Sequence, residues 1–133
     1  MFSRRTMVLS LVFTGCLLVS SSAMAVGQGA SGAFATPVRS GAVRFVAVKR
    51  VVQFNGYQGN MTIAGKKYPG VMYGLPDGSG RVGFVWYYPS DYAQAGQAVL
   101  SPLPNGTYSG PIDFMNRQGN VTESGTMTVN VVF

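Results

Sequence analysis

From Ala42 to the C-terminus, apolar side chains alternate with polar ones in short runs that are separated by turn residues. β-Branched and aromatic residues fill these runs, and glycine recurs throughout. A period of two is typical of half-buried strands, and no apolar period of 3.6 extends beyond one or two turns. The pattern therefore predicts a single all-β domain over residues 42–133, built mainly from three hairpins.

The first predicted hairpin turns at Asn55-Gly56, because both residues tolerate the positive φ of a two-residue type I′ turn. Closing this turn pairs Arg50 with Met61. The remaining residues of the predicted buried face are apolar: Val46, Val48, Val52, Phe54, Tyr57, Met61 and Ile63. The opposite face is polar, so the hairpin is predicted to have one buried and one solvated face.

The second predicted hairpin turns within residues 76–80, over a loop of two or four residues. Either length places Phe84 and Trp86 on the side that faces the core. The other side carries glycines beside apolar and aromatic side chains, namely Tyr68, Met72, Val85 and Tyr87. Either another sheet covers this face or it is an exposed binding patch. We predict partial exposure, in a shape suited to a sugar ring or a partner strand.

The third predicted hairpin turns at residues 116–119 and pairs Ile112 with Glu123. Its apolar face is expected to contain Tyr108, Ile112, Phe114, Val121, Met127, Val129, Val131 and Phe133. Between the last two hairpins, residues 89–105 are expected to hold a short helical turn and a brief strand at 98–100. These elements predict a small antiparallel β-sandwich or a partly closed barrel of about six to eight strands.

Two charged residues, Arg50 and Glu123, fall on the predicted apolar faces. A lone buried charge is costly, so each needs a partner or a route to solvent. We predict that they form a structural ion pair across the core. The alternative is that both reach water at the ends of the sheet.

Residues 1–25 have the composition of a secretory signal peptide. A positive segment at Arg4 and Arg5 precedes an uncharged apolar stretch. Ala23 and Ala25 then place small residues where signal peptidase cleaves, so cleavage is predicted between Ala25 and Val26. We therefore expect a periplasmic or secreted protein.

The route of export and the segment that follows the signal need separate predictions. Residues 3–8 resemble a twin-arginine export motif, although adjacent arginines are common in ordinary signals. Lipidation at Cys16 is a further alternative, but it would leave the small-residue site at 23–25 unused. Residues 26–41 are rich in Gly, Ala and Ser, and we expect them to form a flexible leader.

Composition limits the chemistry available to the chain. It contains no histidine, and its one cysteine, Cys16, lies in the predicted signal. The usual imidazole bases, thiol nucleophiles and zinc ligands are therefore missing. The four carboxylates fall on separate elements and cannot be placed as a catalytic pair. We predict no enzymatic activity, no metal site and no cofactor.

Charge points to anionic partners. Cleavage of the signal would leave eight cations and four acids, a net charge of +4. This favours envelope lipids, acidic glycans or acidic proteins, whereas export and the scattered cations argue against nucleic acid. No transmembrane segment is expected in the mature chain.

The leading hypothesis is a non-enzymatic binding module of the bacterial cell envelope or secreted space that recognises a protein or a glycan. Its predicted contact residues lie in two loops and on the aromatic face: Asp77, Asp91, Tyr92, Tyr68, Met72 and Tyr87. The first alternative is a structural, fimbria-like subunit that self-associates by strand addition at an edge. The second is a small hydrolase that uses Asp77, Asp91 or Asp113.

Overall fold

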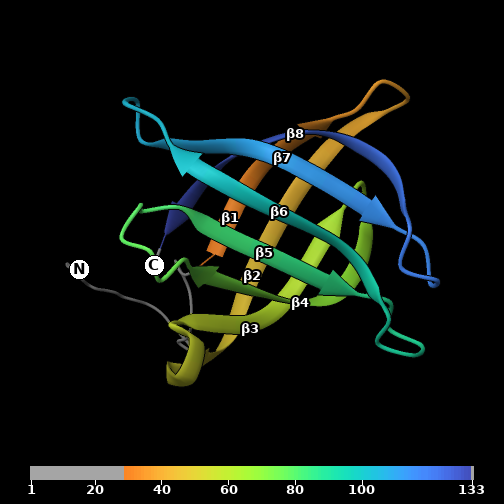
Figure 1. Ribbon diagram of the computed structural model, residues 1–133, viewed down its shortest axis with the longest axis horizontal. Helices are drawn as coiled ribbons and strands as arrows, with labels where there is room; N and C mark the ends of the chain where they lie inside the picture. Colours follow the sequence, from red (N-terminus) through yellow and green to blue (C-terminus); the bar gives the residue numbers. More distant parts are fainter. Residues whose placement is uncertain (1–28, 133) are drawn as a thin grey trace, which may run out of the picture.

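Eight antiparallel strands follow one another around a closed barrel, in which each strand pairs with its neighbours in sequence and β8 closes on β1 (Figure 1). The computed structural model describes residues 29–132. The strands are β1 (Gly29–Ala35), β2 (Ser40–Val51), β3 (Gly56–Ile63), β4 (Lys66–Gly74), β5 (Val82–Tyr87), β6 (Gln94–Pro102), β7 (Thr107–Met115) and β8 (Val121–Val132). The all-β antiparallel prediction is confirmed, and closure makes the fold a barrel.

β1 corrects the prediction of a flexible leader over residues 26–41, because residues 29–35 form a strand that pairs with both β2 and β8. Ala30 and Phe34 are buried in the barrel interior. The small residues that suggested flexibility instead allow close contact between strands. A Cβ at Gly32 would lie 2.0 Å from the carbonyl oxygen of Thr128. The predicted signal peptide and its cleavage site lie outside the described residues.

The β2–β3 connection differs from the predicted two-residue turn. β2 ends at Val51, a short 3₁₀ turn η2 (Val52–Phe54) follows, and Asn55 adopts a left-handed conformation with φ 52°. Arg50 consequently pairs with Tyr57 instead of Met61. The register also shifts between Ala47 and Lys49, which marks a β-bulge at the intervening residue.

The bulge reverses which side chains of β2 face inward, because one extra residue exchanges the two faces of a strand. Val43, Phe45 and Ala47 are buried, whereas Val46 and Val48 lie exposed on the outer surface. The prediction that the two valines belong to the core is therefore wrong. Met61 and Ile63 of β3 are buried as expected.

The β4–β5 hairpin corrects the predicted aromatic face. Gly74 pairs with Val82, so the connection spans the seven residues 75–81. An odd loop length reverses the side-chain parity that a loop of two or four residues would give. Met72 consequently pairs with Phe84, and both are fully buried.

The four residues of the predicted aromatic face therefore separate. Tyr68 pairs with buried Met61 and packs against the core, and Met72 is itself buried. Val85 and Tyr87 alternate with buried Phe84 and Trp86, so they point outward. The predicted core positions of Phe84 and Trp86 are confirmed.

The β7–β8 turn forms where it was predicted, with the Asn116 amide donating to the Asn120 carbonyl at 3.0 Å. Phe114, and not Ile112, pairs with Glu123. This two-residue difference preserves parity, so Ile112 and Phe114 are both buried. A register shift next to Met115 leaves Val121 exposed, against expectation. β6 occupies most of residues 89–105 and includes the predicted strand at 98–100. No helix forms over residues 89–96, but the loop before β6 contains one hydrogen-bonded turn, in which the Tyr92 amide donates to the Tyr88 carbonyl at 2.9 Å.

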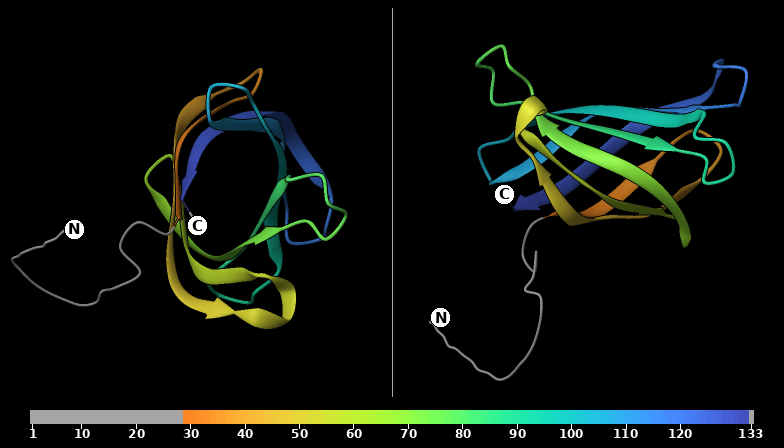
Figure 2. Two further views of the ribbon diagram at one scale, coloured as in Figure 1. Left: turned by 90° about the vertical axis from the view of Figure 1, so that its left-hand side faces the viewer. Right: turned by 90° about the horizontal axis from the view of Figure 1, so that it is seen from below.

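Side chains fill the barrel interior, as expected for eight strands. Figure 2 (left) shows the strands as a ring around this core. The largest fully buried side chains are Trp86, Phe34, Phe45, Phe84, Met61, Met72, Leu100 and Ile112. Residues 29–132 contain no helix long and apolar enough to cross a membrane.

The loops divide between the two ends of the barrel because consecutive strands run in opposite directions. We name these ends after one charged residue at each. The Glu123 end carries loops 36–39, 64–65, 88–93 and 116–120. The Arg50 end carries loops 52–55, 75–81 and 103–106, together with residues 29 and 132.

Candidate functional site

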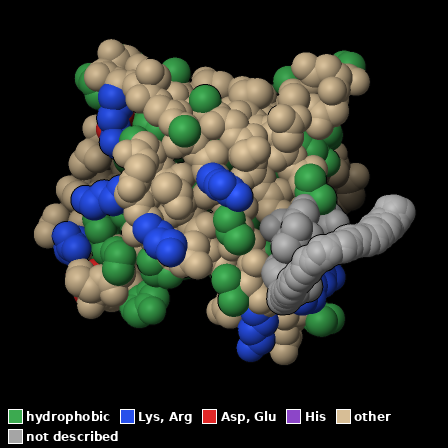
Figure 3. All heavy atoms as spheres, turned by 180° about the vertical axis from the view of Figure 1, so that it is seen from behind, with side chains coloured by type: hydrophobic (Ala, Val, Ile, Leu, Met, Phe, Trp, Pro, Cys, Tyr) green, Lys and Arg blue, Asp and Glu red, His purple; other side chains and the backbone are tan. Residues whose placement is uncertain are grey.

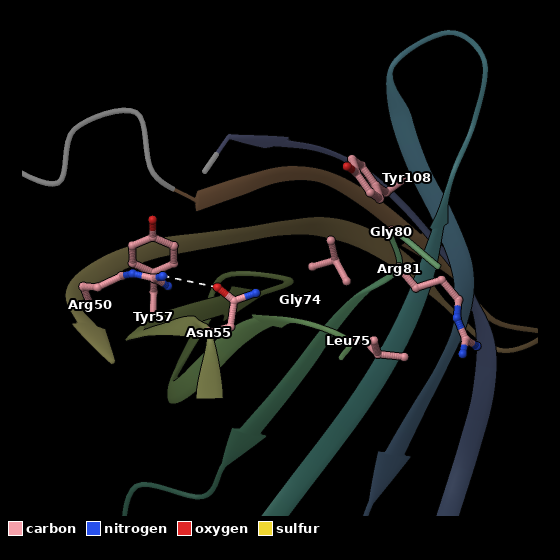
Figure 4. Close-up of a pocket in the computed structure, with 9 residues that line it drawn as sticks. Arg50, Asn55, Tyr57, Gly74, Leu75, Gly80, Arg81 and Tyr108 are labelled. Carbon is pink, nitrogen blue, oxygen red and sulfur yellow. Dashed lines mark hydrogen bonds between the residues drawn. The ribbon is translucent and has the colours of Figure 1, made fainter. Parts of the chain in front are cut away.

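A pocket of about 450 Å³ lies at the Arg50 end (Figure 4). Its lining comes from the β2–β3 connection, the β4–β5 loop and the start of β7. The side chains that define it are Arg50, Asn55, Tyr57, Leu75, Arg81 and Tyr108. The volume falls within the range of small-molecule sites, roughly 300–1,000 Å³.

Arg50 is fixed on one side of the pocket. Its Nη1 donates to the carbonyl of Gly56 and its Nη2 to Oδ1 of Asn55, both at 3.2 Å. Its Cζ lies 5.1 Å from the centroid of the Tyr57 ring, a cation–π arrangement. None of the three salt bridges in the described part of the chain includes Arg50. Its guanidinium is therefore held in place without a carboxylate partner.

Arg81, on the other side, is already neutralised. Its Nη2 lies 2.6 Å from Oδ2 of Asp77, and its Nε donates to Oγ of Ser79 at 3.1 Å. Hydrogen bonds from Ser79 and then Arg81 hold the pKa of the Asp77 carboxyl below its usual value. Figure 4 shows the Arg81 guanidinium pointing away from Arg50. The uncompensated positive charge of the pocket is therefore that of Arg50.

The Glu123 end is closed by an ion pair that packs on aromatic rings. The Glu123 carboxylate accepts a hydrogen bond from the Thr36 hydroxyl at 2.5 Å and pairs with Nε of Arg39 at 3.0 Å. The guanidinium carbon of Arg39 lies 4.5 Å from the centroid of the Phe114 ring. Only 16% of the Glu123 side chain is exposed. The Arg39 charge at this end is therefore compensated by Glu123, unlike that of Arg50.

The predicted Arg50–Glu123 ion pair is wrong. Each residue lies at its own end of the barrel, and each has other partners: Asn55 and Gly56 for Arg50, Thr36 and Arg39 for Glu123. The altered β2–β3 register brings Arg50 to one rim, where it reaches solvent. The positions of the two residues agree with the alternative prediction, that both charges lie at the ends of the sheet.

The two predicted binding loops also lie apart. Asp77 is next to the pocket, through its contact with Arg81. Asp91 and Tyr92 belong to the 88–93 loop of the Glu123 end, where Asp91 pairs with Nε of Arg117 at 3.0 Å. Arg117 in turn stacks on Tyr88, 4.2 Å from its ring centroid. Of the predicted contact residues, only Asp77 adjoins the pocket.

Sequence reasoning missed Tyr57 and Tyr108 as pocket residues, because their parity assigned both to the core. Tyr57 is indeed buried and Tyr108 packs against the core, but both also line the pocket. The available signal was Arg50 itself. A charge that alternates onto an apolar face must be paired or lie at the rim of the sheet, and the rim of a barrel is where a ligand can enter.

All four carboxylates of the chain have side-chain partners. These pairs are Asp77–Arg81, Asp91–Arg117, Asp113–Ser124 and Glu123–Arg39. Within residues 29–132, no group of three or more His, Cys, Asp or Glu side chains is placed to hold a metal ion. The geometry of the Arg50 end therefore suits binding of an anionic or polar ligand through Arg50 and the neighbouring tyrosines.

Acid should weaken the closure at Glu123. The hydrogen bond from Thr36 and then that from Arg39 lower the pKa of the Glu123 carboxyl from its usual value of 4.5. A carboxyl with a lowered folded-state pKa stabilises the fold above its unfolded-state pKa, and this contribution disappears as pH falls through the folded-state value. Glu123→Gln should therefore be less stable than the parent at neutral pH, and the difference should shrink below pH 4.5. Urea unfolding across this range measures it, and a pH-independent difference would contradict the assignment.

No protein-family model matches the chain, and comparison with curated proteins and with solved structures found no match. Fold and site together define a small closed β-barrel with a filled interior, one end closed by the Arg39–Glu123 pair and a pocket at the other.

Proposed function

We propose that this protein is an exported, non-enzymatic binding module that takes a carboxylate-bearing sugar of an acidic glycan into the pocket at the Arg50 end. The observation that carries the proposal is the Arg50 guanidinium, fixed at the rim of a pocket of about 450 Å³ without a carboxylate partner. Export rests on the composition of residues 1–25.

The pocket combines the groups that an acidic sugar requires. A guanidinium has five N–H donors, and the contacts to Asn55 and Gly56 leave some of them for a carboxylate. The ring of Tyr108, which is only partly buried, supplies flat apolar surface of the kind against which sugar faces pack, and Leu75 adds an aliphatic wall. Tyr57 is buried and supports Arg50 through the cation–π contact. The side chain of Asn55 adds amide groups for sugar hydroxyls.

The alternatives have less support. Strand addition needs a free edge, and within residues 29–132 every strand is paired on both sides. Hydrolysis by paired carboxylates needs two that face each other across a substrate. Asp77 and Asp91 lie at opposite ends of the barrel, and Asp113 is bound to Ser124 on the outer wall.

Arg50→Gln should weaken binding of digalacturonate about 10- to 100-fold, the effect of losing hydrogen bonds to a charged group worth roughly 1.5–3 kcal/mol. Calorimetric titration of the protein purified after export measures this. The neutral disaccharide galactobiose should bind weakly to the parent and be insensitive to the substitution.

Arg44→Gln is the matched control, because it removes one positive charge from the same strand at an exposed position outside the pocket. It should leave digalacturonate affinity within about twofold, since exposed charges this far away are largely screened by salt. Equal losses in the two variants, or equal affinity for the charged and the neutral disaccharide, would overturn the proposed function.

A further inference from the structure

The charges of the barrel are distributed unequally along the chain. Residues 29–76, which cover β1 to β4, contain six cations and no acid. Residues 77–132 contain all four acids and only two cations, Arg81 and Arg117, each of which pairs with one of those acids. One side of the barrel wall is therefore basic. Of its six cations, Arg39 forms a salt bridge with Glu123, and the other five take part in none of the salt bridges of residues 29–132.

Three of these cations, Arg44, Lys49 and Lys67, lie on the outer surface of three adjacent strands. Arg44 of β2 pairs with Thr62 of β3, which pairs with Lys67 of β4. Lys49 lies opposite Gln58 further along β2 and β3. We call the outer surface that carries Arg44, Lys49 and Lys67 together with Val46 and Val48 the basic face. Figure 3 shows lysine and arginine side chains spread over this side of the molecule.

Exposed apolar side chains lie among these cations. Val46 is 43% exposed and Val48 is 67% exposed, because the bulge in β2 turns both away from the core. The salt bridges of the described residues include neither Arg44, Lys49 nor Lys67. Exposed valines and unpaired cations therefore share one surface. Such a surface is suited to a partner that offers both negative charge and apolar contact.

We propose that the basic face docks on the surface of an anionic lipid bilayer. The cations would contact the headgroup layer, and the two valines would enter the boundary between headgroups and acyl chains. Strands in a sheet lie about 4.8 Å apart, so Arg44 and Lys67 are roughly 10 Å apart across β3. Cations spread in two dimensions match a plane of headgroups better than a single polyanionic chain, and a hydrated polyanion would gain nothing from the valines.

Docking on this face is independent of the pocket, because Arg44, Lys67 and the two valines do not line it. In the docked position the side wall of β2–β4 lies on the bilayer while the Arg50 end stays open at the edge of the contact. The two activities can therefore be lost separately, which makes Arg50→Gln and Arg44→Gln controls for each other.

The proposal is tested by flotation of the purified exported protein with vesicles of phosphatidylcholine that contain about 30% phosphatidylglycerol. The salt concentration is about 0.1 M, at which surface charges still act over roughly 10 Å. The protein should float with these vesicles and not with pure phosphatidylcholine. Each cation near an anionic bilayer contributes a factor of about five, so Arg44→Gln and Lys67→Gln should each weaken binding about fivefold and the double variant about 25-fold. Arg117→Gln removes the same charge from the opposite half of the barrel and should leave binding unchanged.

The Val48→Ser variant distinguishes binding to a bilayer from binding to a soluble polyanion. It should weaken vesicle binding and leave binding to a heparin column unchanged. The proposal is overturned if the anionic vesicles are not bound, or if Arg117→Gln weakens vesicle binding as much as Arg44→Gln. It is also overturned if Val48→Ser has no effect on vesicles, because the face would then recognise charge alone. Circular dichroism of each variant excludes loss of the barrel as the cause.

Discussion

Trp86→Ala is expected to lower the free energy of unfolding by about 3–5 kcal/mol. The Trp86 side chain is only 1% exposed, and its ring meets that of Phe114 edge to face at a centroid distance of 6.0 Å. Truncation leaves a cavity in the barrel interior, and the surrounding side chains relax only partly to fill it. Urea unfolding followed by circular dichroism provides the measurement.

Tyr92→Ala is the comparison for this truncation, because it removes an aromatic ring that is 68% exposed in the 88–93 loop. Its effect should stay within about 0.5 kcal/mol, because the ring is exposed and alanine and tyrosine adopt the left-handed backbone of this position (φ 57°) at similar cost. A Trp86→Ala effect no larger than that of Tyr92→Ala would mean that Trp86 is not a core residue.

Gly96→Ala is expected to destabilise the barrel by about 1–3 kcal/mol through overpacking. A Cβ at Gly96 would lie 2.2 Å from Cζ2 and 2.4 Å from Cε2 of Trp86, the residue opposite it on β5. The indole has little room to move away from the added methyl group, because it is buried in the core. The same unfolding experiment measures the loss.

A double-mutant cycle checks the cause of this loss. The atoms nearest to the added Cβ all belong to Trp86. In a Trp86→Leu background the alanine should therefore cost little, or even stabilise by about 0.5 kcal/mol, since alanine is intrinsically more favourable than glycine in a strand. An unchanged cost in that background would place the clash elsewhere.

The period-two pattern was sufficient to predict the all-β class and the core positions of Phe84 and Trp86. It could not predict register, because one extra residue exchanges the two faces of a strand. The seven-residue loop 75–81 moved Met72 into the core, and the bulge in β2 turned Val46 and Val48 outward. Both features depend on how strands that are distant in sequence close the barrel.

Closure also explains the error at β1. Its sequence has few large apolar residues and resembles a linker, yet it pairs with both β2 and β8. Gly32 lies against the Thr128 backbone with no space for a Cβ. No local pattern reports such contacts, which arise only when the first and last strands meet.

The candidate site was likewise predictable only in part from the sequence. The sequence identified Arg50 as an unusual charge on an apolar face, and it is the central residue of the pocket. It paired Arg50 with Glu123 because both fall on apolar faces, without using the antiparallel strand order, which places the turns next to them at opposite ends of the barrel. Tyr57 and Tyr108 joined the candidate site only once three separate connections met at one rim.

Mapping digalacturonate onto the backbone amides by NMR tests most directly the claim that the Arg50 end is the binding site. Titration of the exported protein should shift the amides of the pocket, with the largest changes at Arg50, Asn55, Tyr57, Arg81 and Tyr108, and should leave Arg39, Arg117 and Glu123 unchanged. Shifts centred on the Glu123 end or on the basic face, or no shifts at millimolar ligand, would contradict the account.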